Sequence, residues 1–160
     1  MNSLQIAIVV DLSASAFVFG ANVWFFFVQS PVLLKKLGRE QFVPIQMKLT
    51  IVLFKTLVVV LLVMFAASTL HSSLDSATTL AAGIALAAGL MNQFVVVPRA
   101  LRAGGQSRAE IKSKDSEGST FHFASKGVGE RTQWLHRLVV MFVVIMLGGV
   151  AVHGVRLLVI

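Results

Sequence analysis

The sequence predicts an all-α integral membrane protein, a four-helix bundle of four transmembrane helices with both termini outside. Three observations lead to this fold. Only 13% of the 160 residues are charged and the mean hydropathy is +0.84, far from the composition of a soluble domain. Four apolar segments can each supply the ~20 helical residues that cross a bilayer. The basic residues gather in two of the three connections, which sets the orientation.

The expected transmembrane spans, which together make one membrane domain, are residues 4–28, 49–70, 77–97 and 133–159. The first segment is interpreted as a retained span and not as a signal peptide, because it lacks a basic n-region and an Ala-x-Ala site and its apolar run is too long. Pro31 and Pro98 follow the first and third spans, where we expect those helices to stop.

The connections at residues 29–48 and 98–132 are expected to be cytoplasmic loops. Twelve of the 14 Lys and Arg residues lie there or at the start of the fourth span, and none lies between the second and third spans. The positive-inside rule then places both termini outside. A multi-pass protein of a bacterial inner membrane is the preferred location. Nucleic acid is not an expected partner, because basic groups beside apolar spans usually set orientation.

A narrow polar stripe follows the first span. Asp11, Ser15, Asn22 and Gln29 fall within about 40° of one another on a helical wheel. A carboxylate in an apolar span normally faces a bundle interior or a water-filled cavity. Asp11 could therefore be a proton site, a cation ligand or an interhelix hydrogen-bonding group, or a short water-filled vestibule could reach it.

Polar and small residues also enter the other spans. Lys55 shares a helix face with Lys48, and it either joins the polar interior or extends its stem to the interface. Asn92 is expected to hydrogen-bond across helices. Small side chains on the third and fourth spans predict close helix contacts. These small residues are Thr78, Ala82, Ala85, Gly89, Gly148, Gly149 and Gly154.

Three histidines are weak candidates for holding a metal or haem. His71 and His153 are expected at similar heights near the outer surface, and His136 opens the fourth span. Neutral imidazole is a common metal or haem ligand, but no two histidines have a tight local metal spacing. No cofactor is predicted, and haem is kept as an alternative. The absence of cysteine excludes disulfides and thiolate metal sites.

The stretch from Trp24 to Leu49, the Asn92 to Arg99 segment and His136 are three separated regions with a recognisable pattern. This pattern resembles the transmembrane protein 205-like family, an otherwise uncharacterised family of small four-helix membrane proteins. Asn92, followed by Pro98-Arg99, resembles the family's third-span exit, and His136 matches a histidine at the start of its last span. Val143 stands where the compared family member has Asn. The remaining matches, at the first-span exit and beyond, are Trp24, Phe27, Val28, Leu37, Arg39, Phe42, Gln46, Lys48 and Leu49.

The resemblance implies a fold and topology more than a function, since the family has no established biochemical activity. Its animal member is linked to cisplatin resistance. The resemblance also implies a polar cluster at the cytoplasmic side that would suit an anionic headgroup or a small anion. This cluster comprises Gln29, Arg39, Gln46, Lys48, Asn92, Arg99 and His136. A weaker likeness to copper-resistance D and protoporphyrinogen-oxidase type proteins motivates the haem alternative.

The first functional hypothesis is a polar intramembrane pocket that binds or transports a small solute, an ion or a lipid headgroup. Its residues would be Asp11, Ser15, Asn22, Gln29, Arg39, Gln46, Lys48, Lys55, Asn92, Arg99 and His136. A haem-binding redox protein using two of the three histidines is the second hypothesis. The third is a structural or accessory subunit of a membrane complex. Membrane lipids, a second copy or a partner subunit are the expected partners. An enzyme is less expected, because no nucleophile elbow, P-loop or dinucleotide fingerprint occurs.

Overall fold

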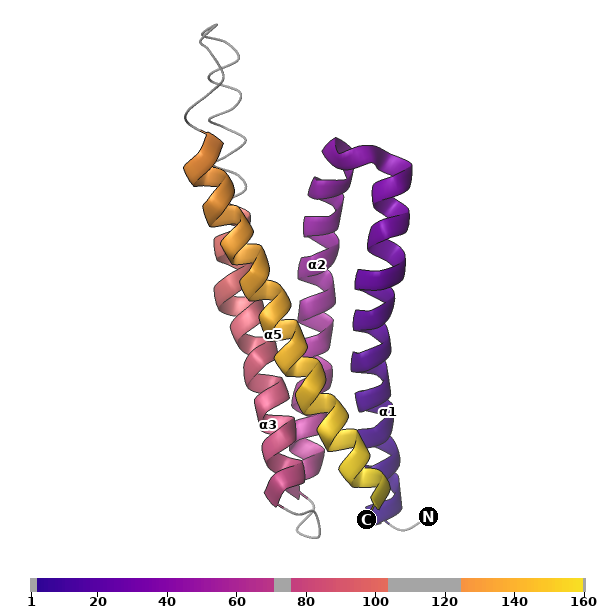
Figure 1. Cartoon of the computed structure of the whole chain (residues 1–160). Helices are drawn as coiled ribbons and strands as arrows, with labels where there is room; N and C mark the ends of the chain where they lie inside the picture. Colours follow the sequence, from indigo (N-terminus) through magenta and orange to yellow (C-terminus); the bar gives the residue numbers. More distant parts are fainter. Residues whose placement is uncertain (1–2, 71–75, 104–124, 160) are drawn as a thin grey trace, which may run out of the picture.

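The computed structural model describes residues 3–70, 76–103 and 125–159, with side chains described for 5–38, 41–70, 76–103 and 134–159. This described part of the chain is entirely helical, and four helices are long and apolar enough to cross a membrane. The predicted fold class is confirmed. The start of α1 and the end of α5 lie at the same end of the bundle (Figure 1). Which side of a membrane that end faces stays a prediction.

The helices extend beyond the expected spans, and part of the segment expected as a loop is helical. The elements are α1 (Ser3–Val23), η1 (Trp24–Gln29), α2 (Ser30–Leu70), α3 (Ser76–Met91), η2 (Asn92–Val96) and α5 (Ser125–Val159). Helix continues from η2 to residue 103. The first reversal of the chain occurs inside α2, at Gly38, whose φ of 68° and ψ of 167° are not helical. A side chain is disfavoured at such a positive φ, so glycine suits this turn.

Pro31 and Pro98 do not end their helices, which differs from the expectation. Each proline follows a π-helical segment. In such a segment a backbone N–H donates to the carbonyl five residues earlier, whereas in an α-helix it donates to the carbonyl four residues earlier. The Ser30 N–H donates to the Phe25 carbonyl, and the Val97 N–H donates to the Asn92 carbonyl. A proline lacks an N–H and its ring clashes with the carbonyl four residues earlier. A local π-helix relieves this conflict and keeps the backbone bonded, as a lipid environment requires.

The two proline segments belong to two similar hairpins, α1–α2 and α3–α5. Phe27-Val28 precedes Pro31 with the same spacing as Phe94-Val95 precedes Pro98. The buried positions also correspond. Residues 11, 14, 15, 18, 22 and 25 of the first hairpin and 78, 81, 82, 85, 89 and 92 of the second are all buried. The two proline-bearing segments therefore bury residues at several equivalent positions.

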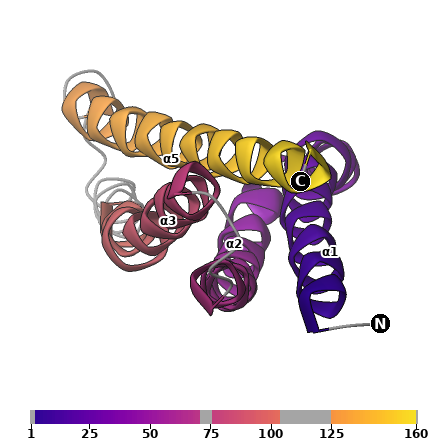
Figure 2. The ribbon, with the colours of Figure 1, turned by 90° about the horizontal axis from the view of Figure 1, so that it is seen from below.

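The hairpins pack through a core of aliphatic, aromatic and small side chains. Phe54, Leu57, Leu61, Met64 and Met146 are fully buried there. Seen along the bundle, α5 crosses α3 and α1, while α2 lies beside α3 (Figure 2). The two hairpins converge at the end that holds both termini and separate toward the other end (Figure 1).

The small residues of α3 and α5 allow the closest approach between two helices. A Cβ added to Gly149 would lie 2.8 Å from the Ala81 carbonyl oxygen and 3.0 Å from the Ala85 Cβ. Gly89 lies against Leu61 in a similar way, with 2.8 Å from its added Cβ to the leucine Cδ1. The predicted close packing is therefore confirmed for these helices. Gly148 has nothing within 4 Å of an added Cβ and takes no part in it.

Candidate functional site: a buried polar cluster at one end of the bundle

Asp11 is the centre of a polar cluster inside the converging end of the bundle. It is the only Asp or Glu within the four candidate spans, and its side chain is buried. Its Oδ2 lies 3.2 Å from Nε2 of His153 on α5. The Ser68 hydroxyl, on α2, donates to the same Oδ2 over 3.2 Å. One carboxylate oxygen thus meets two helices, one from each hairpin.

His153 is completely buried, and its ring is fixed from both sides. Nδ1 lies 3.0 Å from the backbone carbonyl oxygen of Thr78 on α3. A carbonyl can only accept, so Nδ1 carries a hydrogen and donates it to Thr78. This contact directs the second ring nitrogen, Nε2, toward Asp11. The four helices therefore contribute one group each: a carboxylate, a hydroxyl, a carbonyl and an imidazole.

The Asp11–His153 contact is close but incompletely hydrogen-bonded. The His153 Nε2 and the other carboxylate oxygen, Asp11 Oδ1, are both buried without a hydrogen-bonding partner in the described part of the chain. An unpaired buried polar atom costs about 1–3 kcal/mol. The cluster therefore leaves one carboxylate oxygen and one ring nitrogen free for a further hydrogen-bonding group.

The polar stripe of the first span faces the interior, as its position on the helical wheel predicts. Ser15 is buried one turn beyond Asp11, and its hydroxyl lies 3.4 Å from the sulfur of Met64. Asn22 is also buried; its amide nitrogen donates to the Val18 carbonyl over 2.7 Å, while its oxygen is without a partner. Their role as ligand-binding residues stays a prediction.

Other amides repeat this arrangement farther from Asp11. The Asn92 nitrogen donates across the helix interface to the Val139 carbonyl, 3.2 Å away, as expected for this residue. The Gln46 nitrogen donates to the Ser30 hydroxyl over 2.6 Å. In both cases the side-chain oxygen is buried and unpartnered, and the same holds for Gln93. Most of the buried side-chain atoms without a partner in the described part of the chain are therefore acceptor oxygens.

The eleven predicted pocket residues do not form one pocket. Asp11, Ser15, Asn22 and Asn92 are buried, and Gln29 and Gln46 are half-buried. The basic candidates Lys48, Lys55 and Arg99 are exposed, as is His136. The side chain of Arg39 lies outside the described ones. The structure thus separates buried acceptors from exposed basic groups. The anion-binding cluster at the cytoplasmic side that the family resemblance implies stays a prediction.

Ser68, Thr78 and His153 are not predicted from their sequence positions to contact Asp11. Thr78 was assigned to helix packing, and Ser68 was not singled out. Their common height could have been found by counting residues from the ends of the spans. Ser68 and Thr78 flank the connection between the second and third spans, and both Asp11 and His153 lie near chain ends that are expected on that same side.

The haem alternative stays a prediction, and the structure describes two of its three candidate histidines. His136 and His153 are separated by ~25 Å along α5, so they cannot both ligate one haem iron. His71 lies outside the described residues. Within the ranges the structure describes, no group of three or more His, Cys, Asp or Glu side chains could hold a metal ion.

A comparison with known protein families shows to which family the chain belongs. A family model described as a domain of unknown function, DUF4149, matches residues 13–109. The chain belongs to the DUF4149 family. The matched part of this DUF4149 protein contains Ser15, Asn22, Ser68, Thr78 and Asn92, while Asp11 and His153 lie on either side of it. No curated protein and no solved structure matches the chain. The resemblance to the transmembrane protein 205-like family stays a prediction.

Proposed function

We propose that this DUF4149 protein binds a proton at the Asp11–His153 pair and couples that proton to binding or transport of a small solute that carries hydrogen-bond donors or a positive charge. The observation that carries the proposal is the 3.2 Å approach of a buried carboxylate and a buried imidazole from two different hairpins. Ionisable residues inside membrane spans are costly and commonly mark proton relays and ion pathways.

The pair can exist at three protonation levels, and at the middle level one proton can sit on either residue. With Nδ1 donating to the Thr78 carbonyl, Nε2 can face a carboxylic acid as an acceptor or a carboxylate as a protonated donor. Adding a proton to the second state gives an imidazolium beside a carboxylic acid, and removing one from the pair gives a neutral imidazole beside a carboxylate. The attraction between α1 and α5 differs among these states, because charge interactions are strong in a low-dielectric interior.

The distribution of donors and acceptors supports a proton, a cation or a donor-bearing solute over an anion. Asp11 Oδ1 and the side-chain oxygens of Asn22 and Asn92 are buried acceptors without partners. The described Lys side chains are all exposed, so no lysine is placed to neutralise an anion in the interior. A cation or an N–H or O–H group would complete these acceptors, whereas an anion would be repelled by them.

The location of the pair supports coupling to a change in shape. The polar contacts that join the two hairpins, Asp11 with His153 and Thr79 with the Ser68 carbonyl, lie at the converging end. The Ser30–Gln46 bond near the opposite end joins helices of the same hairpin. Because the hairpins already separate toward that end (Figure 1), weakening the Asp11–His153 contact would remove one of the polar contacts between them and alter access to the interior.

Proton uptake by reconstituted protein tests the proposal. Vesicles containing the pH dye pyranine would be driven by a potassium diffusion potential, and internal acidification would be recorded. We expect uptake by the wild-type protein, its loss in Asp11→Asn and His153→Gln, and wild-type uptake in the matched control His136→Gln, which replaces an exposed histidine. Equal uptake by Asp11→Asn and the wild type would reject the transport role of the pair.

Infrared spectroscopy tests proton binding separately from transport. Difference spectra between acidic and basic buffers should contain a carboxylic-acid C=O band that is absent in Asp11→Asn, because the other acidic residues lie outside the candidate spans. The band of a buried acid is expected to exchange slowly in heavy water. Spectra of the two proteins with the same carboxylic-acid bands would reject Asp11 as a proton-binding group.

A further inference from the structure

The exposed lysines of α2 point to a second site, on the outside of the bundle. Lys55 lies near the middle of the candidate span Gln41–Leu70, and its side chain is exposed. The flanking residues on its face, Val52 and Val59, are 62% and 60% exposed. This face is thus apolar and turned outward, where a transmembrane helix meets lipid. A lysine in that environment is unfavourable without a negative group beside it.

The chain supplies no such negative group from its described spans. Asp11 is their only carboxylate, and it is buried against His153. A second copy of the protein would meet the same limitation, because its intramembrane carboxylate is buried as well. An anionic molecule from outside the described spans can therefore supply the counter-charge of Lys55.

Lys48 indicates where that molecule lies. It is exposed and sits seven residues before Lys55, on the same helix face and ~10 Å away along the axis. The flexible stems of Lys48 and Lys55 can bend toward each other along the helix axis, so that both ammonium groups reach one phosphate. Beyond Lys55 the same side of α2 continues with Val59 and Leu62, which are exposed and apolar. A charged pair followed by an apolar strip matches a phospholipid headgroup followed by its acyl chain.

We propose that Lys48 and Lys55 bind the phosphate of an anionic phospholipid whose acyl chain lies along Val59 and Leu62. This site is independent of the interior pair, since it faces the opposite environment and uses basic groups instead of acceptors. Anionic lipids attract basic residues near the membrane surface. The bound headgroup would neutralise Lys55 and hold it in an orientation that would otherwise be unfavourable within lipid.

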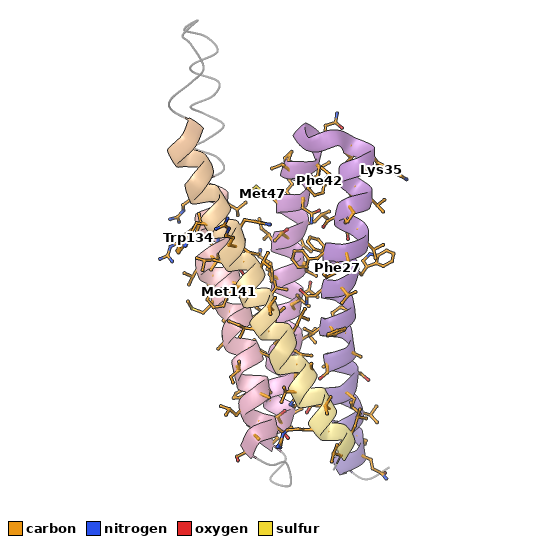
Figure 3. The ribbon with its side chains drawn as sticks, viewed as in Figure 1. Phe27, Lys35, Phe42, Met47, Trp134 and Met141 are labelled. Atoms are coloured by element: carbon orange, nitrogen blue, oxygen red, sulfur yellow. The ribbon has the colours of Figure 1, made fainter. Side chains whose placement is uncertain are left out.

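Native mass spectrometry of the detergent-purified protein tests the site, with phosphatidylglycerol and phosphatidylcholine of identical acyl chains as probes. We expect preferential retention of phosphatidylglycerol by the wild type and a loss of about fivefold in Lys55→Gln and in Lys48→Gln. Lys55→Arg keeps the charge and should keep the lipid. Lys35→Gln is the matched control, because Lys35 is exposed near the turn, away from the centre of α2 (Figure 3).

Several results would overturn the proposal. Equal retention of the two lipids, or unchanged phosphatidylglycerol binding by Lys55→Gln, would show that the lysine stem only extends to the interface. Full competition by inorganic phosphate would indicate a site for a free anion. A partner protein that is lost in Lys55→Gln, with lipid binding unaffected, would assign the counter-charge to that protein.

Discussion

Asp11 of α1 and His153 of α5 lie 3.2 Å apart inside the bundle, although 142 residues separate them in sequence. They connect the first helix of one hairpin to the last helix of the other. The Thr78 carbonyl orients the imidazole, and the Ser68 hydroxyl binds the carboxylate. One residue from each of the four helices therefore takes part in the contacts around this pair of ionisable groups.

Truncating either member of the pair should destabilise the protein. Asp11→Ala removes the carboxylate that lies beside the His153 Nε2 and accepts from the Ser68 hydroxyl, and we expect a loss of about 1–3 kcal/mol in the free energy of unfolding. Asp11→Asn keeps an acceptor and should lose less. Thermal unfolding in detergent measures the difference, and His136→Ala, at an exposed position, is the control for His153→Ala. A melting temperature of Asp11→Ala equal to that of wild type would contradict a structural contribution of the pair.

A designed disulfide should join the two hairpins close to the pair. A Cβ added to Gly154 would lie 3.8 Å from the Ser15 Cβ, near the usual separation in disulfides. Because the chain has no cysteine, Ser15→Cys combined with Gly154→Cys forms a single pair, and we expect it to cross-link on mild oxidation. Peptide mass spectrometry under non-reducing conditions detects the bond.

The cross-linked protein also tests whether the hairpins move. If they separate during proton uptake, oxidation should stop uptake and a reductant should restore it. Ser15→Cys combined with Gly148→Cys is the control, because nothing lies within 4 Å of a Cβ at Gly148. Efficient cross-linking of the control pair would contradict the arrangement of α1 and α5, and undiminished uptake by the cross-linked protein would contradict hairpin movement.

Helical periodicity was enough to predict which residues of the first span face inward. Asp11, Ser15 and Asn22 share one narrow face, and a carboxylate strongly disfavours lipid, so their burial follows from the sequence. The partner of Asp11 did not follow. His153 is remote in sequence, and its selection depends on how two hairpins cross, which the separate spans do not encode. Local periodicity shows which side of a helix is buried. Which residue of another helix lies against that side depends on tertiary packing.

The two prolines lie where the helices change their hydrogen bonding, but the predicted change, a helix end, was wrong. Pro31 and Pro98 were expected to stop helices, as they do in most soluble proteins. Here Ser30 and Val97 donate to carbonyls five residues earlier, and both helices continue. The apolar surroundings explain the difference, because a broken helix would expose unbonded backbone groups to lipid. Asn92 is the first residue of the second π-helical segment, and its side chain donates a hydrogen bond to the Val139 carbonyl of α5.

Gly149 should tolerate no side chain, in contrast to its neighbour. Gly149→Ala brings a methyl group against the Ala81 carbonyl and Ala85, so α3 and α5 must separate or shift. We expect a loss of about 1–3 kcal/mol in the free energy of unfolding. Gly148→Ala places its methyl group in open space and should change stability by less than ~0.5 kcal/mol. Similar melting temperatures for the two variants would contradict the close contact between these helices.

Both termini should lie outside the cytoplasm, and the two basic connections inside. The start of α1 and the end of α5 lie at one end of the bundle, and the turn at Gly38 lies at the other (Figure 1). The excess of basic residues near that turn favours the cytoplasm. In a bacterial host, alkaline phosphatase fused after residue 160 should therefore be active, and a fusion within residues 35–38 should be inactive. The reverse pattern would invert the topology and place the Asp11–His153 pair nearer the cytoplasmic surface, so that its proton would be exchanged with the cell interior.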